Sequence, residues 1–145
     1  MHTVKRTVLV PYSCEQMFAL VADVDKYPEF LPWCGGSQVH EETENGMRAS
    51  VTISIARIRQ TFTTQNTHSY PDNIQVDLVD GPFSSLQGNW QFEALAPDAC
   101  KVIYTMRYKF SSRALEAVVG PVFNRIATSF IDSFTKRAAQ VYGTK

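Results

Sequence analysis

Apolar and polar residues alternate at the start of the chain and then follow a helical spacing. Residues 3–10 alternate and are rich in β-branched side chains, which predicts a strand. Ser13, with Gln16 three positions later, forms a capping-box pattern, and the apolar residues after it recur at helical spacing. We therefore expect a helix from near Ser13 to about Asp23, and residues 26–30 are a candidate for a second short helix.

The next segment, residues 30–36, combines prolines and glycines with large apolar side chains. Prolines remove backbone donors and glycines free the backbone, so we expect a loop. Its side chains Phe30, Leu31 and Trp33 allow two interpretations. They fold back over the core as a plug, or they form an exposed lid or a tip that docks on a membrane.

A period of two then predicts six further strands. Their approximate ranges are residues 38–42, 47–55, 58–66, 74–78, 86–92 and 102–110. Turn residues separate these ranges, because Asn-Gly favours a tight hairpin and Pro beside Asp or Asn presets a turn. The expected turns lie at Asn45-Gly46, at Ala56-Arg57, at residues 70–73 and 80–82, and at Pro97-Asp98.

Helical spacing returns near Ser112 and continues to the end of the chain. Gly120-Pro121 interrupts it, and a proline inside a helix removes one hydrogen bond. We expect a kink or a fresh start there, with Pro121 in a first turn. Sequential hairpins with helices on one face predict an α+β fold, and we expect residues 1–145 to form one such domain.

Composition and charge narrow the class of protein. The 145 residues carry no formal net charge, so the chain lacks the strong positive charge of a protein that coats nucleic acid. Cys14, Cys34 and Cys100 are odd in number and lack the spacing of a zinc or redox site, which predicts reduced thiols in a cytoplasmic protein. No apolar run approaches the roughly 18 residues of a transmembrane helix. Any membrane contact is therefore expected to be peripheral, at the inner face of the membrane.

Catalytic chemistry has little support in the sequence. His2, His40 and His68 are scattered, and no catalytic, metal-binding or phosphate-binding motif is visible. Tyr104, Tyr108 or Arg107 could polarise a ligand carbonyl, but such groups more often orient a ligand or belong to the core. We therefore expect a protein that binds without catalysing and that requires no cofactor or metal.

Three segments together carry a resemblance that covers essentially the whole chain. They are YPEFLPWC at residues 27–34, VDGPF at 79–83 and LQGNWQF at 86–92. With the order of elements, they resemble the START-like (SRPBCC, helix-grip) superfamily, in the branch of the coenzyme Q-binding proteins and the ribosome association toxins. The resemblance implies a seven-stranded antiparallel sheet wrapped on a long C-terminal helix, with one or two short helices after the first strand.

The same resemblance implies three functions. The first is an apolar cavity for ubiquinone or a related polyprenyl lipid, which supports respiratory quinone function. The second is that of a ribosome-binding toxin, which binds the large subunit and blocks its association with the small one. The third and most remote is an enzyme like the polyketide cyclases, which share the fold. The sequence leaves the oligomeric state open.

Candidate site residues follow from these patterns and from the resemblance. The expected cavity and lid residues are Phe30, Leu31, Trp33, Val79, Phe83, Trp90, Tyr104, Met106, Phe123, Ile126, Ala127 and Phe130. For each of them the alternative is ordinary core packing. The candidate contacts to ribosomal RNA are Arg57, Arg59, Arg107, Lys109 and Arg113, for which the alternative is a solvated charged face.

Overall fold

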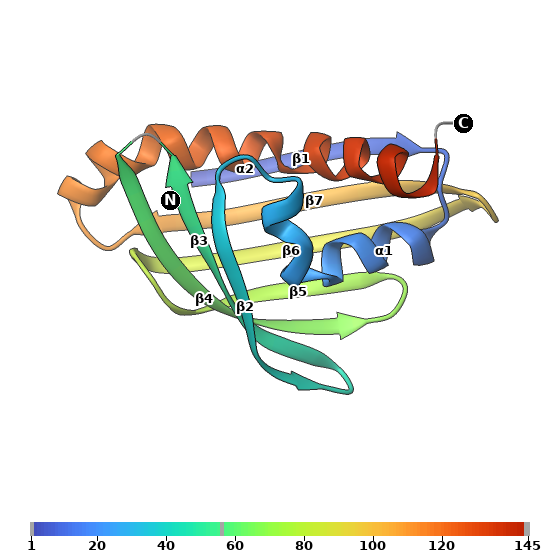
Figure 1. Cartoon of the computed structure of the whole chain (residues 1–145), viewed down its shortest axis with the longest axis horizontal. Helices are drawn as coiled ribbons and strands as arrows, with labels where there is room; N and C mark the ends of the chain where they lie inside the picture. The colour runs from blue at the N-terminus through green and yellow to red at the C-terminus, as the bar shows by residue number, and fades with distance from the viewer. Residues whose placement is uncertain (1, 56, 144–145) are drawn as a thin grey trace.

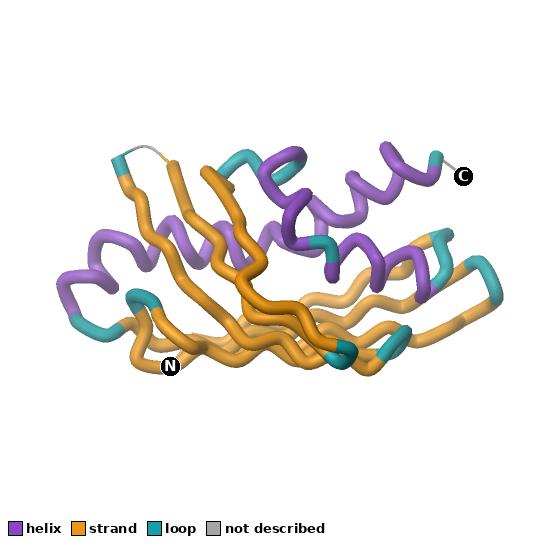
Figure 2. Tube along the Cα trace, turned by 60° about the horizontal axis from the view of Figure 1, so that its bottom comes forward, coloured by secondary structure: helices purple, strands orange, loops and turns teal. Residues whose placement is uncertain are grey.

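The computed structural model describes residues 2–55 and 57–143. One antiparallel sheet carries two α-helices and a 3-10 helix on one face, and Figure 2 shows the sheet curving around them. This is the α+β helix-grip architecture that the sequence predicts. In chain order the elements are β1 (His2–Val10), α1 (Cys14–Ala22), η1 (Val24–Glu29), β2 (Cys34–Thr43), β3 (Gly46–Ile55), β4 (Ile58–Ser69), β5 (Asn73–Asp80), β6 (Phe83–Ala96), β7 (Ala99–Phe110) and α2 (Arg113–Tyr142).

Both helices begin at a serine whose side chain caps them. The Ser13 hydroxyl accepts from the Gln16 backbone N–H at 3.1 Å, and the Gln16 side chain accepts from the Ser13 N–H at 2.9 Å. Ser112 caps α2 by accepting from the Leu115 N–H at 3.1 Å. These bonds satisfy donors that a helix leaves free at its start. Both predicted helix starts are confirmed, and the second short helix is the 3-10 helix η1.

The sheet has the strand order β1-β7-β6-β5-β4-β3-β2, so the first strand lies beside the last (Figure 1). Each neighbouring pair is antiparallel, as expected for strands joined by hairpins. The turns at Asn45-Gly46, at residues 70–73 and 80–82, and at Pro97-Asp98 lie at the junctions of successive strands as predicted, although Gly46, Asn73 and Asp80 are already the end residues of strands. The expected reversal at Ala56-Arg57 includes Ala56, which lies outside the described residues.

The loop before β2 is shorter than the sequence predicts. We expected residues 30–36 to be irregular, but β2 already begins at Cys34. Pairing with β3 explains the difference, because Cys34 lies opposite Ile53 and the Ser54 N–H donates to the Trp33 carbonyl at 2.7 Å. The glycines are therefore part of an edge strand and not of a free loop.

The helix α2 runs without a break through Gly120-Pro121, so the expected fresh start is wrong. Pro121 lies well inside the helix and not in its first turn. The proline costs one helical hydrogen bond. Val119 and Phe123, on either side of it, are both buried against the sheet, and this packing keeps the helix continuous. No helix in the described residues has both the length and the apolar character needed to cross a membrane.

Aromatic packing holds α2 against the sheet. Phe123 lies 4.7 Å from Tyr108 of β7, and Phe134 lies 5.2 Å from Trp90 of β6, both measured between ring centroids. Both phenylalanines are almost completely buried. Burial of one such side chain contributes about 1.5–3 kcal/mol, so a few of these contacts supply most of the attachment.

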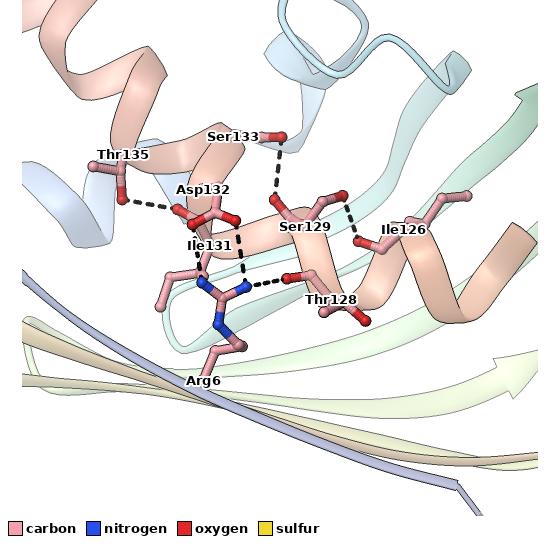
Figure 3. Close-up of polar contacts among 8 residues, drawn as sticks. All are labelled: Arg6, Ile126, Thr128, Ser129, Ile131, Asp132, Ser133 and Thr135. Atoms are coloured by element: carbon pink, nitrogen blue, oxygen red, sulfur yellow. Dashed lines mark hydrogen bonds and ion pairs between the residues drawn. The ribbon is translucent and has the colours of Figure 1, made fainter.

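A polar contact joins the edge strand β1 to the middle of α2 (Figure 3). The Arg6 guanidinium donates to the Asp132 carboxylate at 3.1 Å and to the Thr128 carbonyl at 2.5 Å. The Arg6 side chain is one-third exposed and that of Asp132 two-thirds exposed, so the pair contributes about 0–1 kcal/mol. Its main effect is therefore to fix the position of β1 beside the helix, while the aromatic contacts supply the stability.

Gly46 provides a direct test of the β3–β4 pairing. A Cβ at this position would lie 2.0 Å from the Asn66 carbonyl oxygen, so Gly46→Ala forces the two strands apart. We expect the free energy of unfolding to fall by about 2 kcal/mol or more in urea denaturation. The control is Gly36→Ala, because a Cβ there meets nothing within 4 Å, and its effect is expected to stay below about 1 kcal/mol. Equal free energies of unfolding for the two variants would contradict the pairing of Gly46 with the residues of β4.

Candidate functional site

An internal cavity of about 60 Å³ lies between α2 and the inner face of the sheet. A single bound water needs roughly 10–15 Å³ of such space, so the cavity has room for only a few small groups. Its walls come from η1, from the segment before β2, from strands β3 to β7 and from α2. The lining residues are Val24, Tyr27, Trp33, Ala49, Val51, Ile53, Phe62, Thr64, Asn66, Val76, Leu86, Gly88, Trp90, Tyr104, Met106, Phe123, Ile126, Ala127 and Phe130.

Small residues leave this space open between large ones. Ala127 on α2 and Gly88 on β6 both line the cavity, and neither has a side chain that can reach across it. The aromatic rings around them pack tightly with one another, with 4.5 Å between the centroids of Trp90 and Tyr104 and 5.3 Å between those of Trp33 and Phe130. The cavity is therefore a gap in the aromatic contact between sheet and helix.

Two polar side chains, Thr64 and Asn66, line this otherwise apolar space. Alternation along β4 turns Phe62, Thr64 and Asn66 to the same inner face, and both polar residues are more than nine-tenths buried. The Thr64 hydroxyl donates to the Asn66 side-chain oxygen at 2.9 Å. The sheet therefore places a hydrogen-bonding pair in the cavity wall, although burying polar groups is costly unless they are paired.

The cavity is electrically neutral. Among residues 2–55 and 57–143, none that lines it is an Asp, Glu, Lys, Arg or His. Burial raises the pKa of Tyr27 and of Tyr104 well above the usual value, so both hydroxyls stay protonated. The described residues also contain no cluster of His, Cys, Asp and Glu that could hold a metal ion. This arrangement can hold a neutral group and orient it by hydrogen bonds.

Most of the expected cavity residues come together as the sequence analysis predicts. The structure brings eight of them to the cavity wall: Trp33, Trp90, Tyr104, Met106, Phe123, Ile126, Ala127 and Phe130. They come from the segment before β2, from two neighbouring strands and from α2. That they bind a ligand remains a prediction.

Four expected residues do not line the cavity. Val79 is half exposed. Side chains on β5 alternate between the two faces of the sheet, and Ile74 faces inward, so Val79, five positions later, lies on the outer face. Leu31 is buried in the core outside the cavity. Phe83 packs against Phe110 and Phe123, and its ring centroid lies 4.9 Å from that of Phe123. Phe30 is half buried.

Burial of the segment before β2 decides between its two interpretations. Leu31 is 1% exposed and Trp33 is 4% exposed, so neither side chain forms an exposed tip. Phe30 packs on Phe134 at 5.2 Å and lies under the Arg137 guanidinium at 5.0 Å. The segment folds inward as a plug over the core, and an exposed membrane-docking tip of these side chains is wrong.

Residues of η1, β3 and β4 also line the cavity, above all Thr64 and Asn66, and none of them was predicted from the sequence. A signal for these two was present, since they alternate with Phe62 along one strand. Polar side chains at inward positions look like an outward face when the register is not known. Tyr27 was also missed, and its hydroxyl donates to the Val21 carbonyl.

The five candidate basic residues are all exposed, but they form two separate groups. Arg57 and Arg59 lie in a surface groove with the first turns of α2, which Arg113 begins. Arg107 and Lys109 lie on the outer face of β7, opposite uncharged residues of β6. The structure therefore splits the predicted basic surface between the rim of the sheet and its outer face.

Two of the cysteines meet inside the protein. The sulfur atoms of Cys14 and Cys100 lie 3.1 Å apart, and both residues are buried. Burial raises the pKa of the Cys100 thiol, which disfavours the reactive thiolate. The pairing joins the start of α1 to the start of β7, two segments so far apart in sequence that spacing could not reveal it.

Two curated relatives of this chain have names that point to different roles. The ribosome association toxin RatA of Vibrio cholerae is 48% identical over 143 residues, which cover 99% of each chain. The mitochondrial coenzyme Q-binding protein COQ10 homolog B of Xenopus laevis is 25% identical over 91% of this chain and 56% of its own. Both are named for binding or toxicity and not for an enzymatic reaction.

Three solved structures share the fold. An 18 kDa protein from Caulobacter crescentus is 31% identical, with a TM-score of 0.76 and coverage of 99% of this chain and 100% of that one. A START superfamily protein from Mycobacterium smegmatis is 18% identical, with a TM-score of 0.81 and coverage of 97% and 99%. The Zhui aromatase/cyclase from Streptomyces is also 18% identical, with a TM-score of 0.79 and coverage of 96% and 94%.

The last two likenesses show the fold alone, because their sequence identity is low. They confirm the expected helix-grip architecture. The family described as polyketide cyclase/dehydrase and lipid transport matches residues 10–135, which is most of the chain. Since this match includes every residue that lines the cavity, the chain belongs to the polyketide cyclase/dehydrase and lipid transport family.

Proposed function

We propose that the chain binds the large ribosomal subunit and hinders its association with the small subunit. The observation that carries this proposal is the 48% identity to a ribosome association toxin over 99% of both chains. An identity that extends over the whole length covers surface positions as well as the core. The sequence analysis put quinone binding first, but the relative named for coenzyme Q is only 25% identical, so we place ribosome binding ahead of it.

The rim of the sheet is the surface we assign to ribosomal RNA. Arg57 and Arg59 share a groove with the first turns of α2, where Val118 is 63% exposed. Arginine side chains bind phosphate oxygens in a bidentate manner, and an apolar neighbour can pack against a sugar or a base. A local basic group of this kind can attract RNA to one place on the surface although the protein as a whole carries no net charge.

Charge neutralisation tests this surface. We expect the double variant Arg57→Gln, Arg59→Gln to co-sediment more weakly with purified large subunits than the unchanged protein. Because two phosphate contacts are lost, the slope of log K against log [KCl] should shrink by about 1.5. The matched control is Arg107→Gln, Lys109→Gln on the outer face, for which we expect no change in slope.

Two results would contradict this assignment. One is equal weakening in both double variants, which would move the interface away from the rim. The other is the absence of co-sedimentation of the unchanged protein at low salt, which would remove ribosome binding itself. Circular dichroism of each variant establishes that it is folded.

The second candidate function is binding of a hydrophobic molecule such as ubiquinone or another polyprenyl lipid in the cavity. The observation that favours it is the apolar cavity itself, in a family whose description includes lipid transport. A cavity of about 150 Å³ holds benzene, and ligand pockets usually measure about 300–1,000 Å³. At about 60 Å³ this cavity is smaller than either, so a ring or chain can enter only if the cavity walls move apart.

Filling the cavity tests the second candidate. Ala127→Leu adds three carbon atoms at a fully buried lining position, so we expect it to abolish any lipid mass that native mass spectrometry detects on the purified protein. Ala117→Leu, at an exposed position of the same helix, is the control and should keep the bound mass. If both variants keep the bound lipid mass equally, the lipid binds elsewhere. If the unchanged protein carries no bound lipid mass, the result counts against this function.

We propose no enzymatic reaction. The cyclases among the similar structures are 18% identical or less, which shows the fold alone. In the part of the chain that the structure describes, the cavity lining offers neither a carboxylate nor an imidazole to move a proton.

A further inference from the structure

Two of the three cysteines form a thiol pair at one end of the sheet. The sulfur atoms of Cys14 and Cys100 lie 3.1 Å apart, although the two residues are 86 positions apart in the sequence. Cys14 is the first residue of α1, and Cys100 is the second residue of β7. Neither residue lines the cavity or the groove at the rim of the sheet, so the proposed functions leave this pair unused.

The chain reversal between β1 and α1 brings the two thiols together. Val10, the last residue of β1, lies opposite Cys100 in the sheet. The chain then turns, and the capping box of Ser13 fixes the start of α1 directly at Cys14. Cys14 is 4% exposed and Cys100 is 0% exposed. A paired strand and a capped helix therefore hold both sulfurs in a closed environment.

Only a small movement separates this contact from a covalent bond. The two sulfurs of a disulfide lie about 2.0 Å apart, so the Cys14 and Cys100 sulfurs have to approach by roughly 1 Å. Groups that a fold already holds in contact react far faster than the same groups free in solution. The third cysteine, Cys34, is engaged elsewhere, because its thiol donates to the Gly36 carbonyl at 3.3 Å.

We propose that Cys14 and Cys100 form a redox modification site, at which a peroxide joins the two sulfurs in an intramolecular disulfide. In the first step a deprotonated Cys14 sulfur attacks one oxygen of hydrogen peroxide, the O–O bond breaks, and Cys14 becomes a sulfenic acid. The hydroxide that leaves takes up the thiol proton and forms water. In the second step the Cys100 sulfur attacks the Cys14 sulfur, the S–O bond breaks, and the hydroxyl leaves as water with the Cys100 proton. The two thiols together lose two electrons, which reduce the peroxide.

Burial sets the order of these steps and their pace. It raises the pKa of the Cys100 thiol, and the thiolate is the form that attacks a peroxide, so the first attack falls to Cys14. Because Cys14 is also buried, the peroxide reaches it only when the first turn of α1 opens locally. We therefore expect the bond to form more slowly than an exposed thiol is oxidised.

The bond ties the start of α1 to the sheet and leaves the rim alone. It closes a loop across 86 positions, which removes many conformations of the unfolded chain, so we expect the midpoint of thermal unfolding to rise by about 10 °C. The start of α1 lies beside the C-terminal end of α2, since the Tyr142 hydroxyl donates to the Gln16 carbonyl at 3.0 Å. The arginines at the rim lie beside the first turns of α2, so this inference rests on neither proposed function (Figure 1).

Mass spectrometry of the oxidised full chain tests the site. The purified protein is incubated with hydrogen peroxide, unfolded, and treated with N-ethylmaleimide, which labels every remaining thiol. We expect the oxidised protein to have lost two hydrogen atoms and to carry one label, on Cys34, where the reduced protein carries three. Proteolysis without a reductant should release the Cys14 and Cys100 peptides as one linked species, and dithiothreitol should separate them.

Single variants separate this pair from the third cysteine. Cys14→Ala and Cys100→Ala should each abolish both the linked peptide and the peroxide-dependent rise in the unfolding midpoint. Cys34→Ala is the matched control, because it removes a buried thiol outside the pair, and it should keep both. If one of the pair variants does not fold, the other carries the comparison, and the unchanged protein with and without dithiothreitol supplies the midpoint shift by itself.

Three results would overturn the proposal. The first is oxygen added to Cys14 or Cys100 without a linked peptide, which would mean that the sulfurs cannot approach each other. The second is a linked peptide that contains Cys34. The third is labelling of both Cys14 and Cys100 after prolonged exposure to peroxide that has oxidised Cys34. A linked Cys14–Cys100 peptide with an unchanged unfolding midpoint would overturn the stabilising effect of the bond.

Discussion

The packing of one long helix against a curved sheet is the interaction on which the rest of the structure depends. With 30 residues, α2 is about 45 Å long, and the sheet bends around it (Figure 2). Large aromatic side chains close most of the space between them, among them Phe123 against Tyr108 and Phe134 against Trp90. Ala127 and Gly88 have no long side chain, and both line the cavity that remains.

The same geometry separates two surfaces that could otherwise interfere with each other. The cavity lies inside and is neutral, whereas the arginines that we assign to RNA lie on the rim where β3 and β4 meet the start of α2. The helix α2 contributes to both, with Phe123, Ile126, Ala127 and Phe130 in the cavity wall and its first turns at the rim.

Most of the fold could be predicted because local chemistry marks its boundaries. Ser13 and Ser112 cap the helices, and Asn45-Gly46 and Pro97-Asp98 mark hairpins. Pairing across the sheet could not be predicted in the same way. Strand pairing extends β2 back to Cys34. The packing of Val119 and Phe123 keeps α2 continuous through Pro121, and it too depends on the assembled fold.

The site was harder to predict than the fold, for the same reason. Eight of the expected side chains line the cavity because strong alternation on β6 and β7 fixes their face. The prediction for Val79 was wrong because the residue belongs to the VDGPF segment that suggested a cavity residue, whereas its position on β5 turns its side chain outward. Thr64 and Asn66 were missed because only the register shows that these polar residues face inward.

Sedimentation of ribosomal subunits tests the central claim most directly. Purified protein is added to separated large and small subunits at a magnesium concentration that favours association, and the mixture is resolved on a sucrose gradient. The account predicts that assembled ribosomes decrease as protein is added, and that the protein travels with the large subunit. Unchanged assembly at a molar excess of folded protein, with the protein left at the top of the gradient, would contradict it.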